Sequence, residues 1–400
     1  MRRALEGIRV ADFSHVMAGP YATHLLRLLG AEVIKVESPG GGDAMRYYGS
    51  DRRYDGMAPA FIAVNAGKKS IVLDLKQAQD LERARRLIER SDVLVENFRP
   101  GVMERLGLGY AAVKQLKPDI VYCSVSGYGQ FGPRRDWPAI DNIVQATSGM
   151  MSLGGDPDGP PARVGFPVVD TLTGQTAAFG ILAALFRRDR SGEGEYLDIA
   201  MFDATVAFMT SAVVPYLVTG RALERTGNTG YSGQPTSAVF RARDGRYLSL
   251  GVVQQRQFEQ LARALGREHW LEDPRFVDPD RRRANAADMH AELDAVFATR
   301  DAAAWEAELS AAGIPCGMVR SIGEAADLPG VDARGLRVPV TIPGLPGKEH
   351  VEVLGAGIFS SMVNAEELDP PPKLGEHTAE IAAWLDRDLD RECARDSDRG

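Results

Sequence analysis

An apolar strand, a helix and a second apolar strand follow one another near the start of the chain, and this order constrains the fold more than any other feature. Residues 8–13 have the composition of a strand, residues 21–29 have helical spacing that stops at Gly30, and residues 32–36 form the second strand. Only short joints connect them, which is typical of a βαβ unit with parallel strands. The sequence therefore predicts an α/β protein with a doubly wound, Rossmann-like domain.

The same alternation continues downstream. Residues 70–75, 93–96 and 120–126 are predicted to be strands of the same sheet, and residues 78–90 a helix between the first two of them. Near the end of the chain, residues 376–385 are predicted to form a helix that rejoins this domain. The first domain is thus expected to draw its elements from both ends of the chain.

A change of composition indicates where this domain ends. Residues 198–217 have the apolar content and spacing of one long helix, whereas residues 220–234 are rich in Gly, Thr, Asn and Ser. We place the domain linker there. Residues 1–220, completed by residues 330–400, are predicted to form the large domain, and residues 221–329 a smaller α+β domain.

Charge and composition exclude several classes of function. The 400 residues carry a formal net charge of -8, whereas a nucleic-acid-binding surface needs an excess of clustered Lys and Arg, so no nucleic-acid partner is expected. No apolar run approaches membrane-spanning length and residues 1–8 lead into no long apolar segment, so we expect neither a membrane span nor a signal peptide. The three cysteines and six histidines are scattered, which predicts a cytoplasmic protein without a disulfide framework or a catalytic metal.

One glycine pattern needs separate interpretation. Residues 127–132, Gly-Tyr-Gly-Gln-Phe-Gly, match the GxGxxG pattern of dinucleotide sites and follow a predicted strand. The continuation from Pro133 to Pro138 cannot open the helix whose N-terminus would receive a pyrophosphate. We interpret the segment as a turn-rich loop at the end of a strand, where ligands sit in α/β folds. The sequence contains neither GxxxxGKS/T nor GxSxG, which argues against a P-loop site and an α/β-type serine hydrolase.

Asp170 is the most informative single residue. It stands in residues 165–174, where a strand-like segment leads into the apolar helical run 177–186. From the residues alone, two roles remain open. The commoner one is a helix N-cap. The other is a nucleophile, because backbone amides and the helix dipole would hold the carboxylate ionised, Gly174 would leave room for an acyl group, and a fixed carboxylate can attack a thioester.

Six short motifs are spread over nearly the whole chain. They are Ala18-Gly19-Pro20, residues 29–37 (LGAEVIKVE), residues 68–71 (KKSI), residues 95–101 (VENFRPG), Asp170-Thr171 with Gly174, and residues 374–378 (LGEHT). Taken together, they resemble the CaiB/BaiF family (class III) of CoA transferases, which includes formyl-CoA transferase. The resemblance implies an enzyme that moves CoA from an acyl-CoA thioester to a carboxylic acid.

The resemblance also implies roles for individual residues. Asp170 would be the catalytic nucleophile, forming mixed anhydrides and an aspartyl-CoA thioester. Asp141 would be an acidic neighbour that shares hydrogen bonds with it or raises its pKa, or else an ordinary loop cap. CoA is a substrate here, so no tightly bound cofactor is implied. The implied CoA contacts are Met17, Ala18, Leu73, Asp74, Leu75, Lys76, Asn97, Phe98, Arg99, Arg105, Trp137, Pro138, Ala139 and Ile140.

The implied assembly is an interlocked homodimer. In that family each chain forms a ring from a large Rossmann-like, CoA-binding domain and a small domain, and the partner chain threads through the ring. Residues 328–346, in which Pro and Gly recur, are predicted to lead the chain back to the first domain, as such a ring requires.

Departures from the family pattern bear on the substrate. Met17 stands where formyl-CoA transferase has a glutamine, Tyr48 stands at a tryptophan position, and residues 250–255 lack its glycine-rich loop. We therefore expect an acceptor acid larger than formate, with dicarboxylates such as succinate as the first candidates. The candidates for holding the second carboxylate are Arg46, Arg52 and Arg53.

Two alternative functions share the same resemblance. A 2-methylacyl-CoA racemase needs an acid/base group on each face of the α-carbon, and related racemases place a histidine just before the aspartate that corresponds to Asp141. Here that position is Ile140, which has no titratable group. The other alternative is a catalytically silent CoA-binding protein on the same scaffold, against which the retention of Asp170 argues.

Overall fold

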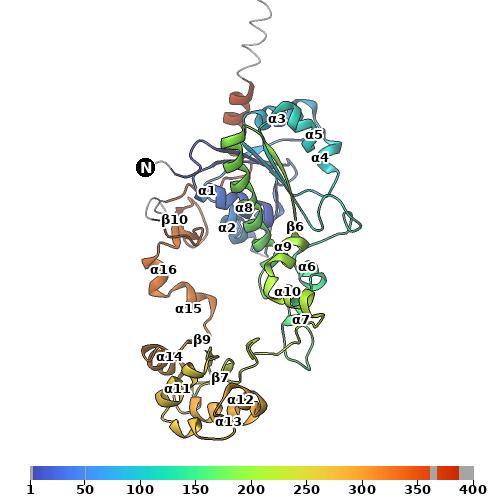
Figure 1. The fold of residues 1–400 in the computed structure, drawn as a ribbon. Helices are drawn as coiled ribbons and strands as arrows, with labels where there is room; N and C mark the ends of the chain where they lie inside the picture. The colour runs from blue at the N-terminus through green and yellow to red at the C-terminus, as the bar shows by residue number, and fades with distance from the viewer. Residues whose placement is uncertain (1–2, 50, 361–366, 387–400) are drawn as a thin grey trace, which may run out of the picture. The chain divides into compact units, whose positions relative to one another are not determined.

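Two compact units make up the chain in the computed structural model, which describes residues 3–49, 51–360 and 367–386 (Figure 1). Unit 1 comprises Met1–Ser148, Val164–Val214 and Pro329–Gly400, and unit 2 comprises Gly149–Arg163 and Pro215–Leu328. Unit 2 thus includes residues 149–163, although the composition of the sequence predicts that they belong to the large domain. That segment is tied to unit 2 by Arg225, whose Nη1 donates to the Gly159 carbonyl at 2.8 Å.

A six-stranded parallel sheet forms the centre of unit 1, with the strand order β3-β2-β1-β4-β5-β6. The strands are β1 (Arg9–Asp12), β2 (Glu32–Glu37), β3 (Lys69–Val72), β4 (Val93–Glu96), β5 (Val121–Ser126) and β6 (Glu195–Ala200). Chain order reverses between β1 and β4, as in doubly wound α/β folds. The predicted α/β fold and its opening βαβ unit are confirmed.

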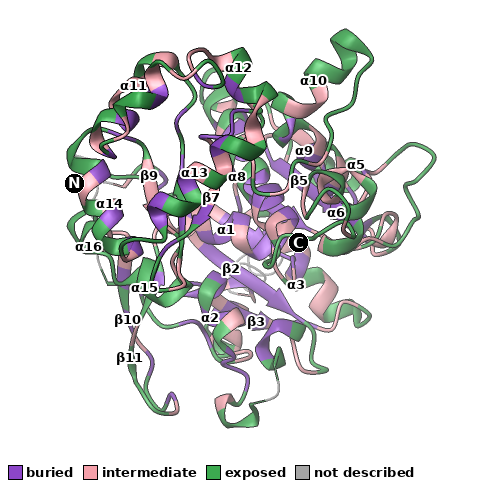
Figure 2. Cartoon of the chain, turned by 90° about the horizontal axis from the view of Figure 1, so that it is seen from below, coloured by how far each residue is buried: buried purple, intermediate pink, exposed green. Residues whose placement is uncertain are grey.

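Helices cover both faces of this sheet. Helices α1 (Ala18–Leu28) and α8 (Val168–Ser191) pack on one face, and α3 (Ala78–Glu89), α4 (Val102–Arg105) and α5 (Tyr110–Leu116) on the other. The further helices are α2 (Pro59–Asn65), α6 (Asp141–Thr147), α9 (Met201–Phe208) and α10 (Thr210–Thr219). Alternate strand residues face opposite ways, so Val10 packs against α1 and α8, and Ala11 against α3, α4 and α5. The strands are consequently buried on both faces, as β2 shows in Figure 2.

The region after β5 differs from the prediction. Residues 198–217 read as one helix, but residues 198–200 complete strand β6, and α9 and α10 are separate helices that meet at a 77° bend. Apolar composition alone does not distinguish a buried strand from a buried helix, which explains the error.

Helix α8 is unusually long and apolar. Among the described residues it is the one helix whose length and composition would let it cross a membrane, and the bent pair α9 and α10 would be a second only if counted as one span. This differs from the expectation that no apolar run reaches that length. Half of the apolar window of α8 is buried inside the protein, where it packs along α1 on the sheet, so the apolar composition suits a core helix (Figure 1).

The C-terminal part of the chain completes unit 1. After α16 (Pro329–Ala333), strands β10 (Arg337–Thr341) and β11 (His350–Leu354) form an antiparallel pair. Residues 378–386 are helical, and Ile381 and Leu385 join the apolar cluster formed with α3 and α5. The predicted late helix is therefore confirmed, and it packs in the first unit.

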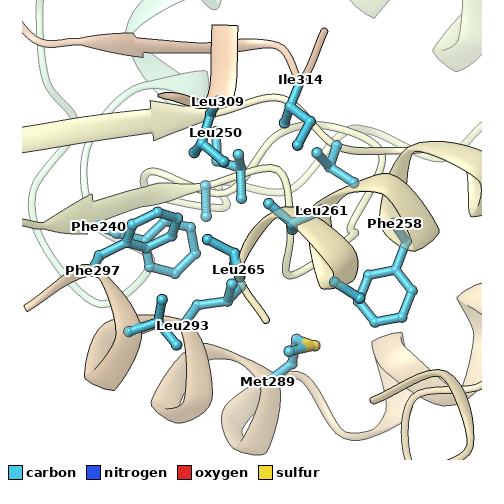
Figure 3. Close-up of a cluster of buried hydrophobic side chains, with 14 of the residues drawn as sticks. Phe240, Leu250, Phe258, Leu261, Leu265, Met289, Leu293, Phe297, Leu309 and Ile314 are labelled. Atoms are coloured by element: carbon cyan, nitrogen blue, oxygen red, sulfur yellow. The ribbon is translucent and has the colours of Figure 1, made fainter. Parts of the chain in front are cut away.

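Unit 2 is built around its own core. An antiparallel sheet in the order β7 (Val239–Arg241), β8 (Tyr247–Leu250) and β9 (Cys316–Met318) is accompanied by α7 (Met150–Leu153), α11 (Gln255–Ala264), η3 (Glu268–Leu271), α12 (Pro279–Ala284), α13 (Ala286–Phe297), α14 (Ala302–Ala311) and α15 (Ile322–Ala326). Figure 3 shows side chains from β7, β8, α11, α13 and α14 meeting in one apolar cluster, with Phe240, Leu261 and Phe297 among them.

Candidate active site

The predicted CoA contacts follow the carboxyl ends of four strands of the parallel sheet. Met17 and Ala18 stand where α1 begins after β1, and residues 73–76 follow β3. Residues 97–99 follow β4, and residues 137–140 follow β5. The carboxyl ends of parallel strands lie along one edge of a sheet, and ligands of open α/β sheets bind outside that edge. The fold therefore collects segments that are far apart in the sequence.

These residues differ in what their side chains can offer. Lys76, Arg99, Arg105 and Trp137 are exposed and free to meet a ligand. Leu73 is buried in the core, so only its backbone could touch one. The remaining predicted contacts are the buried Ala18, the half-buried Met17, Asp74, Leu75, Phe98 and Ala139, and the exposed Pro138 and Ile140.

Asn97 is used to join two of the loops. Its amide Nδ2 donates to the carbonyl of His15 at 2.7 Å, and its Oδ1 accepts from the backbone N–H of His15 at 2.8 Å. The His15 ring also lies against Phe98, with ring centroids 5.3 Å apart. Asn97 thus fixes the loop after β4 to the loop after β1, a role that its motif did not reveal.

The loop after β1 is held in a strained conformation. Val16 has φ +67°, which is unusual for a β-branched residue and costs about 1–3 kcal/mol. Its N–H donates to the carboxylate of Asp43 at 3.0 Å, and Asp43 pairs with the buried Lys35 at 2.9 Å. Lys35 also donates to the Ser14 carbonyl at 2.7 Å. A buried ion pair therefore sets the backbone just before Met17.

Asp170 is the third residue of α8, so the N-cap role considered for it is wrong. Pro167 occupies the cap position, and its side chain has no atom that could accept a hydrogen bond from the free amides of the first turn. The carboxylate of Asp141 does this instead, because its Oδ2 accepts from the N–H groups of Val169 at 2.7 Å and Asp170 at 3.2 Å. Asp141 is the first residue of α6, so it connects the starts of two helices.

Gln145 completes this arrangement, although no motif in the sequence singles it out. Its side chain is buried, its Nε2 donates to Asp141 Oδ1 at 2.6 Å, and its Oε1 accepts from the N–H of Val164 at 2.9 Å. The only signal in the sequence is that Gln145 follows Asp141 by four residues, one helical turn.

The electrostatic environment of Asp170 is opposite to the one expected from its place at a helix start. Burial first, and the nearby Asp141 carboxylate second, raise the pKa of Asp170 from its usual 3.8 to about 7. The expectation was an ionised carboxylate held by backbone amides, but Asp141 accepts two of those amides. A carboxyl group with a strongly raised pKa beside the ligand edge of an α/β sheet is a candidate functional group.

Gly174 has a different role from the one expected. The sequence predicts that it leaves space for an acyl group, but it is buried, and a Cβ on it would meet the Ala18 carbonyl at 2.7 Å and Tyr21 Cδ1 at 2.9 Å. Gly174 therefore allows α8 to approach α1. Because residues four apart lie on one face of a helix, this contact directs Asp170 toward the start of α1, where Met17 lies.

Two of the three arginines proposed for a second carboxylate are already paired. Arg46 is buried and donates to both carboxylate oxygens of Glu37, at 2.8 and 2.6 Å, so the proposal is wrong for this residue. Arg53 pairs with Asp51 at 2.6 Å. The guanidinium of Arg52 is exposed and has no ion-pair partner within the described residues.

Comparisons with known proteins show the family of this chain. The family model for CoA-transferase family III matches residues 5–378. The chain is 39% identical to an acetyl-CoA:oxalate CoA-transferase of Acetobacter aceti, over 94% of both chains. It is 37% identical to a succinate–glutarate CoA-transferase of Agrobacterium fabrum, over 96% of both. A CaiB/BaiF family protein from Brucella suis superposes with a TM-score of 0.86 at 32% identity, over 96% of this chain and all of the other. The chain therefore belongs to CoA-transferase family III and is a CoA transferase.

Proposed function

We propose that this enzyme transfers CoA from an acyl-CoA thioester to a dicarboxylic acid, with Asp170 as the covalent nucleophile. The observation that carries the proposal is the position of Asp170: a half-buried carboxyl group at the start of α8, directed toward the edge of the sheet where the CoA-binding segments gather. The names of two relatives support the acceptor class, since oxalate, succinate and glutarate are all dicarboxylates.

The reaction is proposed to proceed through four acyl transfers. A carboxylate oxygen of Asp170 attacks the thioester carbonyl carbon, the C–S bond breaks, and CoA leaves as a thiolate. The thiolate then attacks the Asp170 carbonyl of the mixed anhydride, which releases the donor acid and leaves an aspartyl-CoA thioester. The acceptor carboxylate attacks this thioester to form a second anhydride, and the thiolate attacks its acceptor carbonyl. These steps give the new acyl-CoA and restore the Asp170 carboxylate.

Asp141 is proposed to position and tune the nucleophile. By accepting the amides of Val169 and Asp170, it fixes the first turn of α8 and removes two hydrogen-bond donors that would otherwise stabilise the Asp170 carboxylate. Its own charge further disfavours ionisation of Asp170. The result is a more basic carboxylate, and Gln145 supports it by orienting Asp141.

For the acceptor, Arg52 remains as the candidate for the second carboxylate. Its side chain is exposed at the 3-10 helix Arg52–Tyr54, close in sequence to the exposed Tyr48. A guanidinium group pairs well with a carboxylate, which favours a diacid over a monoacid.

We also propose that the active form is an interlocked homodimer in the cytoplasm. Phe179 and Phe186 on α8 and Phe208 on α9 are each more than 60% exposed. Such apolar surface is typical of an interface, and a second copy of the chain would cover it. Cys123 and Cys316 are free thiols, in keeping with a reducing compartment, and Cys393 lies outside the described residues. Sedimentation equilibrium across protein concentrations tests the dimer.

One observation keeps the racemase alternative open. Ile140 is the N-cap residue of α6 and offers no proton, but folding brings His15 to the same edge of the sheet. Its ring is half-buried against Phe98, and burial lowers its pKa. Incubation of 2-methylacyl-CoA in deuterated buffer tests this function. We expect α-hydrogen exchange to be much slower than CoA transfer, and rapid exchange that is lost with Asp170→Ala would favour the racemase.

The experiment that tests the proposed function is a matrix of donors and acceptors. Acetyl-CoA and succinyl-CoA are each incubated with formate, acetate, oxalate, succinate and glutarate, and the CoA esters formed are identified by mass spectrometry. Transfer should be fastest to dicarboxylates and absent for Asp170→Ala. Fastest transfer to formate or acetate would contradict the proposed acceptor class, and turnover by Asp170→Ala would contradict the nucleophile.

A further inference from the structure

The backbone of Val16 is held in a conformation that valine avoids. Its φ of +67° lies in the left-handed region, where a β-branched side chain is crowded by its own backbone. Among the described residues, the other non-glycine residue with positive φ is Asp55, of a type that tolerates this region. Val16 lies between β1 and α1, directly before Met17. Strained backbone of this kind persists only where its surroundings impose it, and it is common at functional sites.

The Asp43 carboxylate is the group that imposes this conformation. Both of its oxygens accept from the Val16 N–H, at 3.0 and 3.2 Å, whereas Val16 is 40% exposed, so packing of its side chain contributes little. Asp43 is itself fixed, because it accepts from the N–H of Met45 at 2.9 Å and its own N–H donates to Glu37 Oε1 at 3.0 Å. It is buried and pairs with Lys35 Nζ at 2.9 Å.

Lys35 fixes a second point of the same loop. Its ammonium group donates to the Ser14 carbonyl at 2.7 Å, two residues before Val16. The residue between them, His15, is bonded through its N–H and its carbonyl to the side chain of Asn97, at 2.8 and 2.7 Å. All three loop residues are thus bonded through their backbone to side chains of other segments. The position where α1 begins is therefore set from outside the helix.

The start of α1 faces the helix that carries the proposed nucleophile. A Cβ on Gly174 of α8 would meet the Ala18 carbonyl at 2.7 Å, so the two helices are in contact there. Asp170 lies one turn before Gly174 on the same face of α8. A displacement of Ala18 or of Met17 therefore changes what the Asp170 carboxyl group meets. Reacting groups tolerate little of this, since a misplacement of about 1 Å can lower a rate on the order of 100-fold.

We propose that Asp43 is a positioning residue for CoA transfer. Paired with Lys35, it imposes the left-handed backbone of Val16 and so fixes the start of α1 opposite the nucleophile. Because Asp170 is taken as the reacting group, this role rests on the proposed function. Asp43 is buried and acts through the Val16 backbone, not through contact with the substrate. Its role is separate from that of Asp141, which acts on the first turn of α8.

The first test is kinetic and uses Asp43→Asn, which keeps the shape of the side chain but replaces one acceptor oxygen with a donor. With succinyl-CoA and glutarate, kcat should fall about 10- to 100-fold, while the KM for succinyl-CoA changes less than about threefold. Circular dichroism and thermal unfolding establish that the variant is folded at the assay temperature. A folded Asp43→Asn with the kcat of the wild type would overturn the inference.

Substitutions at Val16 separate positioning from a purely structural role of the ion pair. Glycine adopts a positive φ without strain, so Val16→Gly combined with Asp43→Asn should recover most of the kcat that Asp43→Asn loses. Val16→Pro lacks the N–H and cannot adopt a positive φ, yet it leaves the buried pair intact, so its kcat should fall as well. Val16→Pro decides the question even if Asp43→Asn does not fold. No recovery with glycine, or a wild-type kcat of Val16→Pro, would show that the pair only stabilises the fold.

Glu32→Gln is the matched control. Glu32 lies on β2, the strand of Lys35, but at its amino end, where it pairs with Arg9 at 2.7 Å. The substitution breaks a carboxylate–cation pair of the same sheet away from the loop before Met17, so kcat and KM should stay unchanged. A fall in kcat as large as that of Asp43→Asn would reveal a general effect of broken ion pairs and would reject the positioning role.

Hydrogen exchange separates this inference from the proposed function, because it needs no substrate. Mass spectrometry follows peptides that span residues 13–18 of the free enzyme. The Val16 amide should exchange slowly in the wild type and in Glu32→Gln, and much faster in Asp43→Asn. Faster exchange in Asp43→Asn, with a wild type that transfers no CoA, would uphold the contact that fixes the loop and reject the proposed reaction. Normal transfer by the wild type, with exchange and kcat unchanged in Asp43→Asn, would reject only the positioning role.

Discussion

Replacing Asp170 with Asn should stabilise the protein, and the gain should depend on pH. The pKa of Asp170 is raised from 3.8 to about 7, a difference of about three units, and each unit corresponds to about 1.4 kcal/mol. Ionising this group in the folded state therefore costs up to about 4 kcal/mol, an upper value because the side chain is only half-buried. Asn is neutral and avoids this cost.

The sign of the pH dependence follows from proton binding. Between about pH 4 and pH 7 the folded wild type holds a proton that the unfolded chain has lost, so its stability falls as pH rises. Below this window both states are protonated, and above it both are ionised and the loss is complete. Asp170→Asn should thus equal the wild type near pH 4 and exceed it most at pH 8.

Urea unfolding followed by circular dichroism at pH 5, 6, 7 and 8 measures this difference. Asp189→Asn, which removes an exposed carboxylate near the other end of the same helix, is the matched control and should show no such trend. A stability difference for Asp170→Asn that is constant with pH, or a loss of stability at pH 8, would refute the reasoning about the site.

Three further predictions concern other residues of the proposed site. Asp141→Asn removes the adjacent charge but keeps an acceptor oxygen, so the pKa of Asp170 should fall and the acidic limb of the kcat/KM profile should move to lower pH; an upward move would contradict the coupling. Gly174→Ala places a methyl group against α1 and should cost about 1–3 kcal/mol in urea unfolding, whereas wild-type stability would show that the helices do not meet there. Arg52→Gln should raise the KM for succinate more than the KM for acetate. Arg53→Gln, which loses an existing ion pair, is the control. Equal effects of Arg52→Gln on both acids would show that Arg52 does not bind the acceptor.

The sequence predicted the sheet well because its strands are buried on both faces. Residues 93–96 were predicted with the bounds that the structure has, and β1, β2, β3 and β5 agree to within a few residues. Such strands are short apolar runs between turn signals, which is a local property of the chain. Strand β6 and helix α9 are both apolar and follow one another directly, so the local pattern could not show where the strand ends and the helix begins.

The site was predictable only in part, since its decisive contacts join distant residues. That Asp170 stands near a helix start was visible in the sequence, but the residue that caps this helix is Asp141, 29 positions earlier. The raised pKa follows from that contact and from burial, neither of which a local pattern shows. The prediction for Arg46 is wrong for the same reason, because its burial against Glu37 depends on the fold.

Chemical trapping on Asp170 tests the central claim most directly. The enzyme is incubated with succinyl-CoA, treated with hydroxylamine, and digested with trypsin, which should release residues 164–187 between Arg163 and Arg187. Asp170 is the only Asp or Glu in this peptide, so a hydroxamate on a side-chain carboxyl group there identifies it without ambiguity. We predict the hydroxamate in the wild type, only after addition of the acyl-CoA, and none in Asp170→Ala, which should also be inactive. Normal turnover by Asp170→Ala, or an active wild type whose peptide is never modified, would contradict covalent catalysis by Asp170.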